Sequence, residues 1–246
     1  MFRLFLINCI VLLVWIPRLR NFFLNLCGLN LHKTSKVGLS FILNKNIKLG
    51  KYSKISHFNF LQCDSVTLLE NSTIGRLNFF RGRFDVYMED NSHIGNSNIL
   101  KNNGLRVIPK VSSLKLGFCS KITSAHYIDL SCNVIFGNNC IVGGRNSTLW
   151  THGFVHFNKG TKRLIKLEGI HIGDGVYIGS NCVLNPGTVI CDEINIGSGT
   201  SIAGHLKEAG LYVNQKVRYV KLGSLDEFLE NREYDPKYKT GNIRVL

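Results

Sequence analysis

The sequence lacks the features that mark several classes of protein. Its 246 residues include eight cysteines but no C-x-x-C pair, and the cysteines mostly lie among apolar residues. This arrangement favours reduced core thiols in a reducing compartment over a disulfide framework. Histidine and cysteine are not grouped at the spacing of metal ligands, so no metal is expected.

A membrane-spanning run is also missing. The apolar stretch Leu4–Ile16 is shorter than the ~20 residues that a spanning helix needs, and no small-residue cleavage site follows it. Arg18 and Arg20 then interrupt further apolar residues, as in a helix that lies in a membrane interface. We expect residues 1–31 to form an apolar, amphipathic helical segment. Two interpretations remain open: contact with the cytoplasmic face of the cell membrane, or packing on the main domain or a neighbouring subunit.

Acidic residues are scarce. The chain has 16 Asp and Glu against 30 Lys and Arg, a formal net charge of +14, which favours anionic partners. Its basic residues are spread along the chain and no recognition motif is present, which argues against nucleic acid.

An aliphatic residue at every sixth position dominates residues 170–204. The series is Ile172, Ile178, Leu184, Ile190, Ile196 and Ile202, and the residue after each is nearly always small or tolerant of a positive φ. Because side chains two apart on a strand share a face, each hexad predicts a very short strand followed by a tight corner. Stacked coils bury a face that no single coil can bury, so the period predicts a parallel β-helix solenoid.

The same period extends toward the N-terminus with interruptions. One phase is Leu116, Ile122, Ile128 and Val134, a second is Phe136, Val142 and Thr148, and fainter runs are Leu49, Ile55, Leu61 and Met88, Ile94, Leu100. We expect one domain at residues 32–206, with a loop at 155–169 that carries Lys159, Lys162, Arg163 and Lys166. This basic loop is either a solvated surface or a contact for an anionic sugar or lipid-linked diphosphate. Residues 207–246 should add a strand or two, a helix at 224–234 and a tail.

The hexads I-H-I-G-D-G-V-Y-I-G-S-N-C-V-L-N-P-G-T-V-I, followed by I-G-S-G-T-S-I-A-G, resemble the hexapeptide-repeat acyltransferases. The likeness is greatest to the galactoside, maltose and polysaccharide O-acetyltransferase branch. It implies a left-handed β-helix, acetyl-CoA as the co-substrate, and a homotrimer whose acetyl-CoA sites lie between neighbouring solenoids. The six-residue period does not by itself define the hand of the coil.

Two further segments resemble the site of that family. G-R-N-S-T-L-W-T-H-G-F (144–154) resembles the corner that presents the catalytic histidine, so His152 is predicted to be the general base. S-A-H-Y-I-D (124–129) resembles a segment of polysaccharide-modifying members, and His126 is the second catalytic candidate, with a structural role as its alternative. The predicted substrate contacts are Asp129, Asn146 and Trp150.

The resemblance also suggests residues that hold the co-substrate. Tyr177 stands where the family usually has Trp, and the pantetheine arm is expected near Ser180, Asn185, Ala203 and Gly204. The segment V-N-Q-K-V-R-Y (213–219) lacks the Gly and Pro of the usual G-N-P-A-K-V-I. Lys216 and Arg218 nonetheless keep cations there for an adenosine phosphate.

The predicted activity is acetyl-CoA-dependent O-acetylation of a sugar hydroxyl in surface polysaccharide biosynthesis, on a free or lipid-linked glycan at the inner face of the cell membrane. Two alternatives remain: N-acetylation of an amino sugar or sugar nucleotide, and a solenoid that binds without catalysis. The fold does not decide between them.

Overall fold

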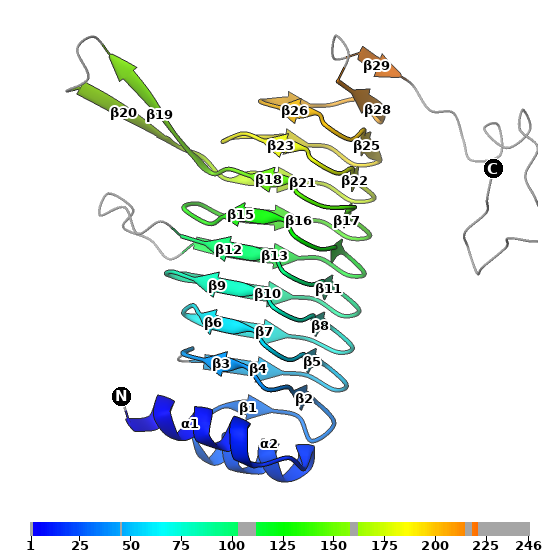
Figure 1. The fold of residues 1–246 in the computed structure, drawn as a ribbon. Coiled ribbons are helices and arrows are strands. Elements are labelled where there is room, and N and C mark those ends of the chain that lie inside the picture. Colours follow the sequence, from blue (N-terminus) through cyan, green and yellow to red (C-terminus); the bar gives the residue numbers. More distant parts are fainter. Residues whose placement is uncertain (1, 45, 103–111, 158–161, 215–217, 221–246) are drawn as a thin grey trace, which may run out of the picture.

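The computed structural model describes residues 2–44, 46–102, 112–157, 162–214 and 218–220, and Figure 1 shows its course. Two short helices lie across one end of a column of stacked coils, and each coil contributes a strand to each of three sheets. The strands within these three sheets pair in parallel, with the antiparallel pair β28–β29 at one end as the exception in the described residues. The predicted parallel β-solenoid is confirmed, and its coils fit a left-handed β-helix.

The elements have the following bounds. The helices are α1 (Phe2–Leu13) and α2 (Pro17–Leu26). Sheet A contains β1 (Asn30–Leu31), β4 (Asn46–Leu49), β7 (Ser65–Leu68), β10 (Phe84–Met88), β13 (Ser112–Leu116), β16 (Val134–Phe136), β21 (Ile170–Ile172), β24 (Val189–Ile190) and β27 (His205–Leu206). Sheet B contains β2 (Lys36–Val37), β5 (Lys54–Ile55), β8 (Thr73–Ile74), β11 (His93–Ile94), β14 (Lys121–Ile122), β17 (Ile141–Val142), β22 (Tyr177–Ile178), β25 (Ile194–Ile196), β28 (Gly210–Val213) and β29 (Arg218–Val220). Sheet C contains β3 (Phe41–Ile42), β6 (Phe60–Gln62), β9 (Phe79–Arg81), β12 (Ile99–Lys101), β15 (Tyr127–Asp129), β18 (Thr148–Leu149), β23 (Val183–Leu184) and β26 (Ser201–Ile202).

The core is built from the predicted aliphatic positions. All six residues of the series Ile172 to Ile202 are buried, and each stacks on its counterpart in the neighbouring coil. Corners must come close to one another for this stacking. A Cβ added at Gly179, for example, would lie 2.8 Å from the backbone nitrogen of Ser198. The hexad therefore alternates one inward aliphatic residue with a corner that has little room for a side chain.

The interruptions of the period lie at corners. Phe136 stacks on Leu116 in sheet A. Three hexads after Leu116 end at position 134, so this coil contains two extra residues, and they lie in the corner at 130–133. The expectation for Thr148 is wrong. Leu149 is the buried residue of that coil and stacks between Ile128 and Leu184, because the corner at 143–147 is one residue longer than a hexad provides.

The segment expected as a loop at 155–169 contains most of a two-stranded antiparallel hairpin. Its strands are β19 (His152–Phe157) and β20 (Lys162–Leu167), and they project from the side of the solenoid next to β18 (Figure 1). Lys166 forms an ion pair with Glu168 at 3.1 Å. Lys159 and the side chains of Lys162 and Arg163 lie outside the described part of the structure.

The two helices cap the open edges of all three sheets. Asn25 accepts a bond from the Leu31 amide and donates to the Leu31 carbonyl of β1, and Asn8 makes the same pair of bonds with Ile42 of β3. Arg20 donates to the carbonyl of Val37 in β2. An uncapped edge strand exposes unpaired backbone groups that invite association with other strands. One side of the helices therefore packs on the main domain, as one of the two interpretations of residues 1–31 predicted.

The other side of the helices is exposed and apolar. Phe2, Leu13 and Trp15 are 71–79% exposed. No helix among the described residues is long and apolar enough to cross a membrane. The helix expected at 224–234 and the tail lie outside the described residues.

Candidate active site

The corner that follows sheet C brings Asp129 and His152 together. Asp129 is the last residue of β15 and His152 follows β18, the neighbouring strand in the sheet. The longer corner at 130–133 and the base of the hairpin enclose the carboxylate, which is fully buried, whereas the His152 side chain remains 12% exposed. A buried acid is thus placed behind a histidine that reaches the surface.

Asp129 accepts four hydrogen bonds from side chains and backbone. His152 Nδ1 lies 2.7 Å from Oδ2, and the same oxygen accepts from the Thr151 amide at 3.0 Å and the Thr151 hydroxyl at 2.7 Å. The Ser131 hydroxyl donates to Oδ1 at 2.8 Å. These four donors hold the buried carboxyl group in one orientation. They favour a positioning role for Asp129 over the substrate contact suggested by the sequence.

This network determines which nitrogen of His152 can accept a proton. Because Nδ1 donates to the carboxylate, the neutral ring carries its lone pair on Nε2. Nε2 forms no hydrogen bond with any described residue. The arrangement is suited to general-base catalysis, in which Nε2 takes a proton and the carboxylate stabilises the imidazolium.

Aromatic side chains surround the ring of His152. Trp150 and Phe154 lie near it, with ring centroids 5.8 and 6.0 Å away in edge-on geometry. Tyr127 packs against Trp150 at 5.0 Å. Trp150 is thus placed beside the candidate base, as a site-lining residue requires.

His126 has a different environment. It lies at the corner before sheet C, where Asn59, Asn78 and Asn98 occupy the same position in earlier coils, and each side-chain oxygen in this ladder accepts the next backbone amide. His126 continues the ladder, because its Nδ1 accepts from the Ser147 amide at 3.1 Å and its Nε2 contacts the Thr123 hydroxyl at 3.0 Å. Burial lowers the pKa of His126 to about 4. These contacts favour the structural alternative.

The predicted co-substrate residues divide between two corners of the solenoid. Asn185, Ala203 and Gly204 lie on the corner column that carries His152, in the next two coils. Tyr177 and Ser180 lie along sheet B and the corner after it, as does the exposed Asn146. Within one chain the structure therefore does not bring all of them together.

The second corner is tightly packed. Tyr177 lies over Gly143, where an added Cβ would be 2.6 Å from the phenol oxygen, and an added Cβ at Gly144 would be 1.7 Å from Ser180 Oγ. Gly144 also has φ +65, which disfavours any larger residue. Lys216 lies outside the described residues, and for Arg218 only the backbone in β29 is described.

Sequence reasoning missed Ser131 and Thr151 as partners of Asp129. The only local signals are the hydroxyl two residues after Asp129 and the one before His152. Cys132 lies in the same corner, but burial, with a smaller effect of the Asp129 charge, raises its thiol pKa, so it is a poor nucleophile. No group of three or more potential metal ligands occurs in the described ranges.

Comparisons with known proteins agree with this architecture. No protein-family model matches the chain, and no curated protein matches its sequence. Among solved structures, the polysialic acid O-acetyltransferase OatWY superimposes with a TM-score of 0.50 at 14% identity, over 78% of this chain and 83% of that one. The polySia-specific acetyltransferase NeuO gives 0.48 at 20% identity, over 78% and 79%. A hexapeptide-repeat acetyltransferase from Vibrio cholerae O1 biovar eltor, complexed with acetyl coenzyme A, gives 0.40 at 16% identity, over 44% and 59%. The predicted resemblance to the hexapeptide-repeat acyltransferases is confirmed at the level of the fold.

Proposed function

We propose that this protein is an acetyl-CoA-dependent O-acetyltransferase that modifies a sugar hydroxyl of a surface polysaccharide or its lipid-linked precursor. The observation that carries the proposal is the pairing of the buried Asp129 with the surface-reaching His152 at 2.7 Å. The fold shared with a polysialic acid O-acetyltransferase supports a polysaccharide as the acceptor.

The chemistry follows from the network around His152. Nε2 takes the proton of the acceptor hydroxyl as that oxygen attacks the thioester carbonyl. The new C–O bond forms, the C–S bond breaks, and the imidazolium returns its proton to the departing thiolate. Asp129 stabilises the imidazolium, because its Oδ2 lies 2.7 Å from Nδ1 of the ring.

We also propose a homotrimer. The residues expected around acetyl-CoA occupy two different corners of one chain, so a complete site requires the His152 corner of one copy to face the Tyr177 and Ser180 corner of another. Light scattering should give about 83 kDa, three times the 27.7 kDa chain. A stable mass of one chain would contradict the assembly.

Finally, we propose that residues 1–31 hold the enzyme at the cytoplasmic membrane face. The exposed apolar side chains of α1 support this, while the capping bonds of Asn8, Arg20 and Asn25 hold the same helices to the first coil. Deletion of residues 1–31 would remove both functions together, so point variants are the sharper test.

The proposed activity is tested with radiolabelled acetyl-CoA and a panel of free polysaccharides, lipid-linked glycans and amino sugars. We expect label in a glycan that mild base releases, as for an ester. Base-stable label found only in amino sugars would identify an N-acetyltransferase instead. A folded protein that transfers no label to any acceptor would support the non-catalytic solenoid.

A further inference from the structure

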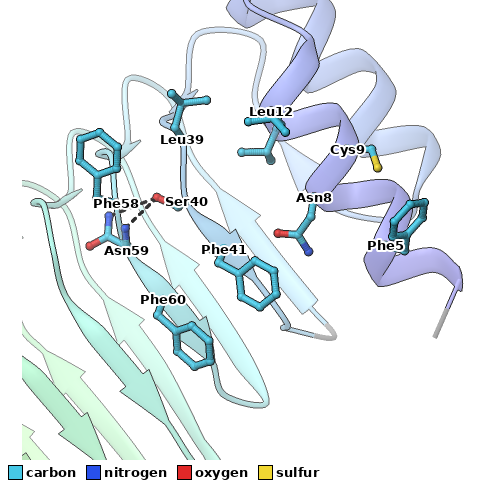
Figure 2. Close-up of a pocket in the computed structure, with 11 residues that line it drawn as sticks. Phe5, Asn8, Cys9, Leu12, Leu39, Ser40, Phe41, Phe58, Asn59 and Phe60 are labelled. Atoms are coloured by element: carbon cyan, nitrogen blue, oxygen red, sulfur yellow. Dashed lines mark hydrogen bonds between the residues drawn. The ribbon is translucent and has the colours of Figure 1, made fainter.

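A large apolar groove lies between the N-terminal helix and the first rungs of sheet C. It has a volume of about 680 Å³, and Figure 2 shows its two walls. Phe5 and Leu12 of α1 form one wall, and Phe41, Phe58 and Phe60 of the first two coils form the other. Phe41 and Phe60 stack on each other with ring centroids 5.6 Å apart.

The polar side chains of the groove already have partners. Asn8 is bonded to both backbone groups of Ile42, and Asn59 donates to the carbonyls of Ser56 and Gly75. Ser40 donates to the Ser56 carbonyl (Figure 2 shows its bonds with Asn59). A sugar would therefore find few free hydrogen-bonding groups there. The lining suits a hydrocarbon chain.

One residue of the groove is held in an unfavourable conformation. Phe58 is 64% exposed and has φ +62, in the left-handed region that bulky residues rarely adopt. Later coils place Ser97, Ala125 and Asn146 at this corner, which fit it better. Leu77, in the coil between, shares the strained conformation (φ +58) but does not line the groove. Strain of this kind is often retained at sites of function.

The net positive charge of the N-terminal sequence indicates which kind of lipid surface would supply the hydrocarbon chain. The first 63 residues contain nine Lys and Arg and no Asp or Glu. Exposed apolar side chains of α1 extend from the groove, among them Phe2 and Leu13. Exposed apolar side chains in a segment that is basic overall complement an anionic lipid surface.

We propose that this groove docks the protein on an anionic phospholipid bilayer by taking a lipid acyl chain between α1 and Phe41, Phe58 and Phe60. The inference rests on the membrane association proposed above and specifies its surface and its lipid chemistry. The groove begins at β3 and His152 follows β18, five rungs along the sheet, or about 24 Å at the usual strand spacing. Variants in the groove should therefore leave the catalytic corner intact.

The test is co-sedimentation of the full chain with vesicles of phosphatidylcholine, with and without phosphatidylglycerol. Wild type should bind the anionic vesicles at least tenfold more tightly than the neutral ones, and less tightly at high salt. Phe58→Asn should weaken this binding about tenfold, while its melting temperature stays equal or rises because Asn tolerates the left-handed conformation. Leu77→Asn is the matched control, with the same relief of strain and binding within twofold of wild type.

A second pair of variants tests the groove at strand positions, where the substitution does not change the conformation of a corner. Phe41→Gln removes an exposed ring of the groove, and Ile99→Gln changes the same outward position three rungs away. Only Phe41→Gln should lose vesicle binding. Equal binding by Phe58→Asn, Phe41→Gln and wild type would overturn the groove proposal, and so would a change in oligomeric mass of these variants, which would assign the groove to a second copy of the chain. Wild type that ignores anionic vesicles but acetylates a soluble glycan would overturn the docking and leave the proposed activity standing.

Discussion

His126 and His152 lie at opposite ends of the same part of sheet C, and their surroundings differ in every respect that matters for proton transfer. His126 is 1% exposed, and contacts with Ser147 and Thr123 occupy both of its nitrogens. His152 is bonded at Nδ1 to Asp129, and its Nε2 forms no hydrogen bond with any described residue. A histidine is thus a candidate base when a carboxylate binds one ring nitrogen and the other nitrogen forms no hydrogen bond. Proximity to a family motif is not sufficient.

The same comparison separates two uses of a corner. The corner before sheet C repeats a side chain that bonds the next coil, and His126 substitutes for asparagine in that series. The corner after sheet C is enlarged at 130–133 and opens into the hairpin at β19, so its side chains no longer serve the repeat. The candidate active site therefore lies where the coil departs from the regular repeat.

The largest expected effect comes from removing the base. His152→Ala should lower kcat by roughly 10²–10⁴-fold, the usual contribution of a general base. The affinity for CoA, measured by calorimetry, should change little, because the ring contacts Asp129 and aromatic neighbours. An unfolded variant is excluded by circular dichroism before turnover is compared.

A smaller loss is expected when the charge behind His152 is removed. Asp129→Asn can keep the bonds that Oδ2 accepts from Thr151, but the NH2 group that replaces the other oxygen cannot accept from Ser131. The neutral amide cannot stabilise an imidazolium, so kcat should fall by about 10–1,000-fold. The KM for acetyl-CoA should stay within about threefold, since Asp129 is buried. A rise in the KM for the acceptor with unchanged kcat would instead indicate a substrate contact.

Ser131→Ala should have a modest effect on turnover. The Ser131 hydroxyl donates to Asp129 Oδ1, and the carboxylate keeps its three other donors without it. We expect kcat to fall by about three- to tenfold, because the carboxylate is less firmly oriented. Ser120→Ala, at a corner in sheet B away from this network, is the control and should match wild type in kcat if it folds.

His126→Asn should affect turnover least, within about twofold of wild type at neutral pH, because Asn is the ladder residue of earlier coils. Its effect should appear in stability. The folded-state pKa of His126 is about 4, below the unfolded value near 6.5, so wild type loses stability as the pH falls through that window. The loss from this residue between pH 7 and pH 5 is about 2 kcal/mol. Urea unfolding at pH 7 and pH 5 should show that the free energy of unfolding of His126→Asn falls by about 2 kcal/mol less than that of wild type. A variant with full pH sensitivity and greatly reduced kcat would reverse the roles of the two histidines.

Much of the fold could be predicted from the sequence because its period is local. Each hexad from Ile172 to Ile202 specifies one inward side chain and one corner, and repetition then requires stacking. Thr148 shows where such counting fails, since a single extra corner residue transfers the buried position to Leu149. Length changes of this kind depend on contacts between coils, which a count along the chain does not contain.

The site was only partly predictable for the same reason. His152 was indicated by a short motif, but its partnership with Asp129 depends on two coils coming into register. The ladder that includes His126 joins Asn98 and Ser147, which are far apart in sequence. The caps made by Asn8, Arg20 and Asn25 were hidden in a segment whose apolar residues suggested only a membrane or a packing surface.

The most direct test of the account is the acetyl-transfer rate of His152→Ala as free imidazole is added. The His152 side chain is 12% exposed, so a small base can enter the space left by the ring. We predict a low rate without imidazole that rises in proportion to the neutral form of the added base. A rate within threefold of wild type in the absence of imidazole would contradict the assignment of His152 as the general base.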